Sequence, residues 1–246
     1  MTLAYLRRGL LAGLLAGLLA GLFGFAFGES ALDEAIMFEE SSHAGEEHAE
    51  EVFDRGQQKA GLFLATGIYG AAAGCVFGLV SAYFRSRVSA RSEWARSLSL
   101  AVAIFAGAVL SPFLKYPPNP PGVGVDPETL ATRTAAYLAM VALSLLALFF
   151  AWRLARQLEG FAPHARHLLV GAFVLVAWAL LAFLLPDAGS DGGAPAGLVW
   201  NFRLSSLGTQ SVLWAGIGVV FGLLGEKAEA REGRGISKLA AEGRPR

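Results

Sequence analysis

The stretch RRGLLAGLLAGLLAGLFG, from Arg7 to Gly24, combines two leading arginines with an uncharged run in which glycine returns at every fourth position. Residues four apart lie on one face of a helix, so these glycines form a shallow groove that a neighbouring helix can approach closely. A second apolar stretch offers a matching surface. The glycines are Gly9, Gly13, Gly17 and Gly21 in the first stretch and Gly70, Gly74 and Gly78 in the second. The pattern predicts a glycine-packed pair of helices inside a membrane.

The same opening stretch has an alternative interpretation as a secretory signal peptide. Arg7 and Arg8 resemble a basic n-region, and Ala26-Phe27-Gly28 resembles a cleavage site between small residues. The apolar run from Gly9 to Phe27 is longer than the about 7 to 15 residues of a signal h-region. Its length favours a retained first span, and cleavage stays open.

Composition indicates a membrane protein. Hydrophobic residues make up 54% of the 246-residue chain and charged residues only 16%. The 20 basic and 20 acidic residues balance, so no overall field would recruit nucleic acid. The single cysteine, Cys75, excludes an intrachain disulfide and a cluster held by several cysteines.

Six uncharged stretches approach the ~20 residues that a helix needs to cross a bilayer. They run near Gly9 to Phe27, Ala60 to Phe84, Leu98 to Leu114, Thr134 to Trp152, Leu168 to Leu185 and Leu207 to Gly225. We therefore predict an all-α, polytopic bundle of about six transmembrane helices that forms a single domain over residues 1–225, with a polar tail at 226–246. The third span is expected to end or kink at Pro112.

The distribution of Lys and Arg predicts the orientation. Fifteen basic residues fall in the two termini and in the segments after the second and fourth spans, against five in the remaining segments. Because cytoplasmic segments carry the excess of positive charge, both termini are expected in the cytoplasm.

The first outward segment, residues 28–58, is long, acidic and rich in histidine. Ser30 followed by Asp33 resembles a helix start. Carboxylates and imidazoles together suit a divalent transition metal, although charge runs of this kind are usually solvated surfaces. The candidate metal-capture residues are Glu39, Glu40, His43, Glu46, Glu47, His48, Glu50 and Glu51.

The third span is followed by SPFLKYPPNPPGVGVDPETLATR, from Ser111 to Arg133, which contains five prolines before Gly122. Prolines force extended backbone and leave carbonyls without helical partners. Such backbone lies at membrane depth only where it is buried or lines a wet cavity. The segment is either a stiff outer loop or a re-entrant constriction in which Lys115 and Asn119 shape a cation pathway.

The beginning of the sixth span carries polar groups. Arg203 needs a partner, for which the acidic first segment is the expected source. Gln210 lies just inside the span, where an amide either holds helices together or faces a pathway.

No enzyme motif is present: the chain lacks HExxH, GxSxG, CxxC and the GxxxxGK[ST] loop of ATP-driven proteins. We therefore expect neither catalysis nor a bound cofactor, and any pumping would draw on an ion gradient, on a partner or on downhill flow of the substrate.

Taken together, the six spans, the Glu/His-rich first segment, KYPPNPPGVG at 115–124, DPETLATRT behind it and FRLSSLGTQSVLW at 202–214 resemble the CbtA family of predicted cobalt transporter subunits. The matching positions are Lys115, Tyr116, Pro117, Asn119, Pro120, Pro121, Gly122, Arg203, Ser206 and Gln210. The resemblance implies cobalt uptake across a bacterial inner membrane for cobalamin synthesis, with a small single-span subunit, CbtB, as a partner.

The leading hypothesis is that the acidic segment concentrates cobalt ions, which are the substrate, and that a pathway near Lys115, Asn119 and Gln210 admits them. Lys115 would then need a carboxylate beside it, for which the candidates are Glu29, Asp33 and Glu34. The alternative is a non-conducting accessory or metal-sensing scaffold that delivers metal to a conducting partner.

Overall fold

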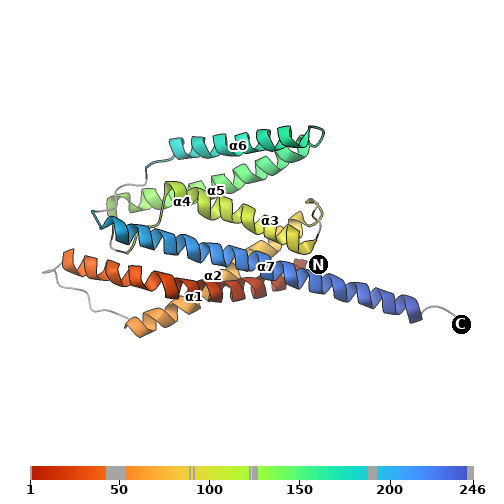
Figure 1. Ribbon diagram of the computed structural model, residues 1–246, viewed down its shortest axis with the longest axis horizontal. Coiled ribbons are helices and arrows are strands. Elements are labelled where there is room, and N and C mark those ends of the chain that lie inside the picture. The colour runs from red at the N-terminus through yellow and green to blue at the C-terminus, as the bar shows by residue number, and fades with distance from the viewer. Residues whose placement is uncertain are drawn as a thin grey trace. The chain divides into compact units, whose positions relative to one another are not determined.

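The computed structural model describes residues 2–42, 54–88, 90, 92–121, 123, 127–187 and 193–242, and all of the regular structure in these ranges is helical. The helices are α1 (Thr2–Ser42), α2 (Arg55–Phe84), α3 (Glu93–Phe105), the π-helix η1 (Ala106–Leu110), α4 (Ser111–Lys115), α5 (Pro127–Gln157), α6 (Pro163–Leu184) and α7 (Ala196–Glu242) (Figure 1).

Among the described residues, six helical stretches are long and apolar enough to cross a membrane. They are Thr2–Glu39, Arg55–Phe84, Glu93–Lys115, Thr129–Gln157, Pro163–Leu184 and Ala196–Arg231. Each overlaps one predicted span, and the third comprises α3, η1 and α4 in succession. The predicted all-helical, polytopic class is confirmed.

α1 differs from its prediction, because the helix start expected at Ser30 does not exist. The helix runs without interruption from Thr2 to Ser42, so the first part of the segment expected to be a loop over 28–58 is helical. Ala31 and Ala35, four residues apart, are almost completely buried. An existing helix extends without the cost of a new nucleus, and the buried alanine face stabilises the extension more than a Ser30 cap would stabilise a break.

The third span also continues past the point where Pro112 was expected to end or kink it. The Ser111 N–H donates to the Ala106 carbonyl, five residues back, which is the π-helical pattern. A wider turn accommodates a ring that would collide with the carbonyl four residues before it. α4 then carries the chain to Lys115.

α7 is longer than the predicted sixth span at both ends. It begins at Ala196, so Arg203, which precedes the span predicted from Leu207, lies on the helix. It also extends through most of the predicted polar tail, to Glu242. The apolar sequence ends at Gly225, and the helix continues through the charged residues that follow.

The chain divides into two compact units, here called unit 1 (Met1–Phe23, Val52–Val102 and Ser211–Arg246) and unit 2 (Gly24–Glu51 and Ala103–Gln210). Each is described by itself.

In unit 1, α1 and α2 pack glycine against glycine. A Cβ added at Gly74 would lie 2.7 Å from the Cα atom of Gly13 and would collide with the Gly9 carbonyl. A Cβ at Gly17 would lie 3.1 Å from the Cα atom of Gly70. The backbones of α1 and α2 are therefore in direct contact along the faces that carry a glycine at every fourth residue.

The part of α7 that belongs to unit 1 also packs through glycines. A Cβ at Gly218 would lie 2.7 Å from the Ala101 Cβ, and one at Gly222 would lie 2.8 Å from the Trp94 Cα. Phe221, between these glycines, is buried and meets Phe77 edge to face, with ring centroids 5.1 Å apart. Small residues thus bring the helices together around a few aromatic side chains.

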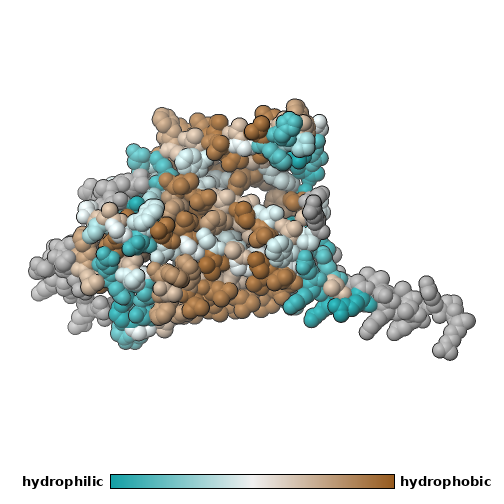
Figure 2. Space-filling view, in the orientation of Figure 1, coloured by the Kyte–Doolittle hydropathy of each residue, from teal (hydrophilic) through white to brown (hydrophobic). Residues whose placement is uncertain are grey.

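In unit 2, α5 contacts α6, η1 and α4. Tyr116, Ala136 and Met140 form its buried cluster, against which Trp178 and Leu181 of α6 pack. None of the described residues of α6 is fully buried, and Phe183 is 86% exposed. The visible surface of α6 is accordingly apolar along its length, with hydrophilic residues at the turn that joins it to α5 (Figure 2), as expected for a helix against lipid.

Candidate functional site

The proline-rich stretch at 112–121, here called the proline segment, is anchored to the connection after α6. The Lys115 Nζ lies 3.1 Å from the Asp187 Oδ1, and the Tyr116 hydroxyl donates to the Pro186 carbonyl. Burial raises the pKa of the Tyr116 hydroxyl above its ordinary value, which keeps the hydroxyl protonated as a donor. The first half of the proline segment is therefore held against the connection that follows α6.

Arg203 of α7 fastens the middle of the proline segment. Its Nη2 donates to the Asn119 Oδ1 at 2.8 Å, and its Nε donates to the Pro118 carbonyl at 3.3 Å. Prolines leave backbone carbonyls without intrahelical donors, and a guanidinium group satisfies several acceptors at once. Pro118 and Asn119, in the first sequence block that carries the resemblance, thus contact Arg203 in the second block.

These contacts show that the pairing predicted for Lys115 is wrong. Lys115 was expected to pair with Glu29, Asp33 or Glu34, and it pairs with Asp187 instead. The carboxamide oxygen of Asn119 accepts from Arg203, so one of its lone pairs is already used. Arg203 contacts the proline segment, and its predicted pairing with the acidic first segment stays a prediction.

The acidic candidates fall partly outside the described residues. Glu29, Asp33, Glu34 and Glu39 lie on α1, where the last three are exposed. Glu40 is also helical, and His43, Glu46, Glu47, His48, Glu50 and Glu51 lie outside the described residues. Within the part of the chain that the structure describes, no three His, Cys, Asp or Glu side chains gather as metal ligands would.

Gln210 of α7 is the candidate with an unused polar atom. Its Oε1 is buried and has no hydrogen-bond partner among the described residues. Its neighbours on the same helix are engaged: Thr209 donates to the Ser205 carbonyl, and Ser205 donates to the Phe27 carbonyl of α1. Ser205 therefore joins α7 to α1 here, and Gln210 keeps a buried acceptor oxygen without a partner among the described residues.

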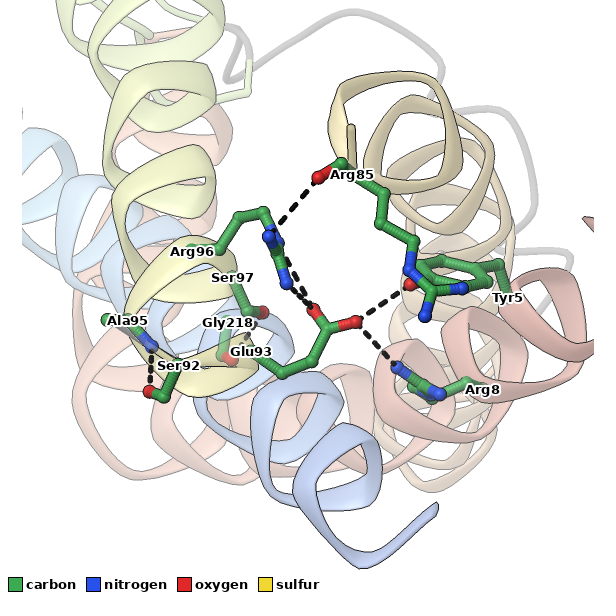
Figure 3. Close-up of polar contacts among 9 residues, drawn as sticks. All are labelled: Tyr5, Arg8, Arg85, Ser92, Glu93, Ala95, Arg96, Ser97 and Gly218. Atoms are coloured by element: carbon green, nitrogen blue, oxygen red, sulfur yellow. Dashed lines mark hydrogen bonds and ion pairs between the residues drawn. The ribbon is translucent and has the colours of Figure 1, made fainter. Parts of the chain in front are cut away.

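Sequence reasoning missed a second polar centre, which lies in unit 1 around Glu93 (Figure 3). The side chain of Glu93 is only 5% exposed. The Tyr5 hydroxyl donates to its Oε1 at 2.7 Å, and the Arg96 Nη2 lies 3.0 Å from its Oε2. The Arg8 Nη1 lies 3.9 Å from Oε1. One carboxylate thus receives groups from both α1 and α3.

Arg85 completes this Glu93 cluster, which we define as Tyr5, Arg8, Arg85, Glu93 and Arg96. The Arg96 Nη1 donates to the Arg85 carbonyl at 3.2 Å, and the Arg85 guanidinium carbon lies 5.8 Å from the centre of the Tyr5 ring. In the sequence these arginines indicate only the orientation of the spans. The available signal was Glu93 itself, the one acidic residue in the basic stretch from Arg85 to Arg96.

Comparison with known proteins identifies the family. The sequence profile described as "Probable cobalt transporter subunit (CbtA)" matches residues 2–226. No curated protein and no solved structure matches the chain. The match covers all six candidate spans almost completely and includes both the proline segment and Arg203. The resemblance inferred from the motifs is confirmed, and the chain belongs to the CbtA family of probable cobalt transporter subunits.

Proposed function

We propose that this chain conducts divalent cobalt inward across a bacterial inner membrane and so supplies cobalamin synthesis. Membership of the CbtA family over residues 2–226 carries this proposal. The six helices of membrane-spanning length supply the scaffold that such a function needs.

The proposed pathway passes Gln210. A cation that leaves water needs oxygen ligands, and the buried Oε1 of Gln210 is an acceptor that no described group occupies. Amide oxygen is a weak, neutral ligand for a dication, so it would offer a resting position without trapping the ion.

The proline segment shapes the mouth in this proposal. Two cationic groups near it would repel a dication, but the Asp187 carboxylate lies beside Lys115, and Arg203 is engaged with the Asn119 and Pro118 oxygens. We assign Asn119 a positioning role through its bond to Arg203. The capture role of Glu39, Glu40, His43, Glu46, Glu47, His48, Glu50 and Glu51, and the pathway role of Glu29, Asp33 and Glu34, are kept as proposals.

Radiolabelled cobalt uptake into proteoliposomes that contain the full chain alone tests this function. We expect time-dependent uptake, and we expect Gln210→Ala to lower its initial rate about tenfold, the scale on which loss of a group near a metal changes activity. Gln157→Ala removes an exposed amide at the end of α5 and serves as the matched control, with uptake unchanged. Equal uptake by Gln210→Ala and the parent chain would remove Gln210 from the pathway.

A second function is favoured by the family description, which calls its members subunits. In that alternative the chain is a non-conducting accessory or metal-sensing scaffold that delivers metal to a partner, of which a CbtB-type single-span protein is the proposed example. Absence of uptake by the chain alone, with uptake restored by co-reconstitution of the partner, would support it.

A further inference from the structure

We propose that the π turn η1 supplies a backbone carbonyl oxygen as a ligand for the divalent cation on the pathway that passes Gln210. The inference rests on the proposed function, because it adds a position to the same pathway. It starts from the backbone hydrogen bonds around Pro112, since a helix that spans a membrane has to satisfy these bonds without water.

The backbone on either side of Pro112 has more carbonyl groups than N–H groups. The Ser111 N–H donates to the Ala106 carbonyl, five residues back, and the Tyr116 N–H donates to the Pro112 carbonyl, four residues back. Between these two bonds stand five carbonyls, those of residues 107–111. Because proline has no N–H, only the three N–H groups that follow Pro112 remain for them.

A side chain supplies one further donor. The Trp178 Nε1 of α6 donates to the Ser111 carbonyl at 3.4 Å. The four carbonyls of residues 107–110 are then left with three N–H groups, and no other group of the described residues donates to them. At least one of these four carbonyl oxygens is therefore an acceptor without a donor.

The surroundings of η1 do not supply the missing donor. Gly107 is buried, and a Cβ there would lie 2.8 Å from the Leu148 Cδ1 and 3.0 Å from the Leu145 Cδ2 of α5. Ala108 and Val109 are half-buried. Leucine side chains cannot donate hydrogen bonds, and an acceptor left empty in an apolar environment carries a cost in free energy. A cation or a water molecule would remove that cost.

Gln210 gives an independent observation of the same kind. Its buried Oε1 is also an acceptor without a partner, and it belongs to unit 2, as η1 does. Gln210 lies seven residues, about 10 Å, along α7 from Arg203, which contacts the proline segment. Leu110, the last residue of η1, lies five residues, about 8 Å, before Lys115 of that segment. Both unused acceptors thus lie at a similar distance along their helices from the proline segment.

Acceptors without donors favour a cation over an anion. Residues 97–114 of the third span contain no charged side chain, so the ligands offered there are neutral oxygens. Interrupted helices in transporters provide backbone carbonyls to ions in this way. Neutral oxygens replace part of the water around a dication without holding it by charge, which lets the ion move on.

Restoring the missing N–H tests the proposal. Pro112→Val introduces a donor with a side chain of similar size, and Pro112→Ala introduces the same donor with a smaller one. We expect both variants to lower the initial rate of radiolabelled cobalt uptake into proteoliposomes about tenfold. We expect their thermal midpoints in detergent to be no lower than that of the parent chain, because the new N–H adds a helical hydrogen bond.

Pro163→Ala is the matched control. Pro163 is exposed and stands in the first turn of α6, where a backbone N–H has no helical acceptor, so its replacement should leave uptake unchanged. Unchanged uptake in both Pro112 variants would overturn the proposal, because the carbonyl would then hold no more than water. A parallel fall of uptake and thermal midpoint would also overturn it, since Pro112 would then act through the fold. So would an equal loss of uptake in Pro163→Ala.

Failure of the proposed function gives a different result. If the parent chain alone takes up no cobalt, conduction by this chain is wrong, and equilibrium dialysis of radiolabelled cobalt against the purified full chain in detergent tests the η1 site directly. The parent chain should then bind cobalt more tightly than Pro112→Val does, and equal binding would overturn the site as well.

Discussion

At the scale of single residues, Glu93 is the buried anion that Tyr5, Arg8 and Arg96 share in unit 1. It accepts from Tyr5 and Arg96 and lies 3.9 Å from Arg8, while its own side chain is almost completely buried. A buried charge is tolerated only when it is paired and hydrogen-bonded. Removal of this one anion would take the shared carboxylate away from both Arg8 and Arg96.

Glu93→Gln should therefore lower the free energy of unfolding by about 3 to 5 kcal/mol, the usual cost of breaking a buried ion pair. Thermal unfolding in detergent checks this. Glu159→Gln is the matched control, because the Arg156–Glu159 pair is exposed at both side chains and should contribute less than about 1 kcal/mol. Similar thermal midpoints for Glu93→Gln and the control would show that Glu93 does not hold unit 1 together.

At the scale of elements, α1 and α2 approach closely because the residues at their contact are glycines, which have no side chain. Gly13 and Gly74 face each other so closely that a methyl group on either would meet backbone. Without a hydrophobic driving force between helices in lipid, close backbone approach supplies much of the attraction through dispersion and polar contacts. The helices cannot separate locally to admit a Cβ without losing contacts along their shared length.

Gly74→Ala should destabilise the protein by about 1 to 3 kcal/mol through overpacking. Gly17→Leu, with a larger side chain beside the Thr66 carbonyl and Gly70, should prevent assembly of the pair and give aggregated material in size-exclusion chromatography. Gly61→Ala on α2 is the control, since a Cβ there meets nothing within 4 Å, and helix propensity predicts a gain of up to about 1 kcal/mol. Unchanged thermal midpoints for Gly74→Ala would contradict the proposed packing.

At the scale of the whole molecule, the charge distribution predicts the direction in which the helices cross the membrane. The six candidate spans among the described residues would place both termini on one side, and the excess of Lys and Arg in the termini and in two connecting segments predicts that this side is the cytoplasm. This orientation is a proposal, and it determines which end of the pathway meets the acidic segment.

A reporter experiment tests the orientation. A fluorescent protein fused after Arg246 should fluoresce, because the proposed orientation places that end in the cytoplasm, where the fluorescent protein folds. Alkaline phosphatase inserted in the connection between α6 and α7 should be active, because it requires an oxidising compartment. Phosphatase activity from a fusion after Gln157, between α5 and α6, would contradict the proposed orientation.

The sequence by itself determined the number of spans, the helical class and the glycine face of α1, because hydropathy and a spacing of four residues are local properties of the chain. It also pointed to the family through the proline segment and the residues around Arg203. It did not determine the helix limits: α1 passes Ser30, and η1 carries the third span beyond Pro112. α1 continues because Ala31 and Ala35 are buried, and the third span continues because a π turn accommodates the Pro112 ring.

Only the tertiary structure decided which charges meet. Lys115 pairs with Asp187, 72 residues away, and Tyr5 donates to Glu93, 88 residues away, so neither pairing follows from a pattern along the chain. The sequence contains 20 acidic residues that could pair with a given basic side chain, and only the distances in the folded protein decide which of them does. The sequence thus determines what enters the membrane, and the packing of those helices determines which polar groups become partners there.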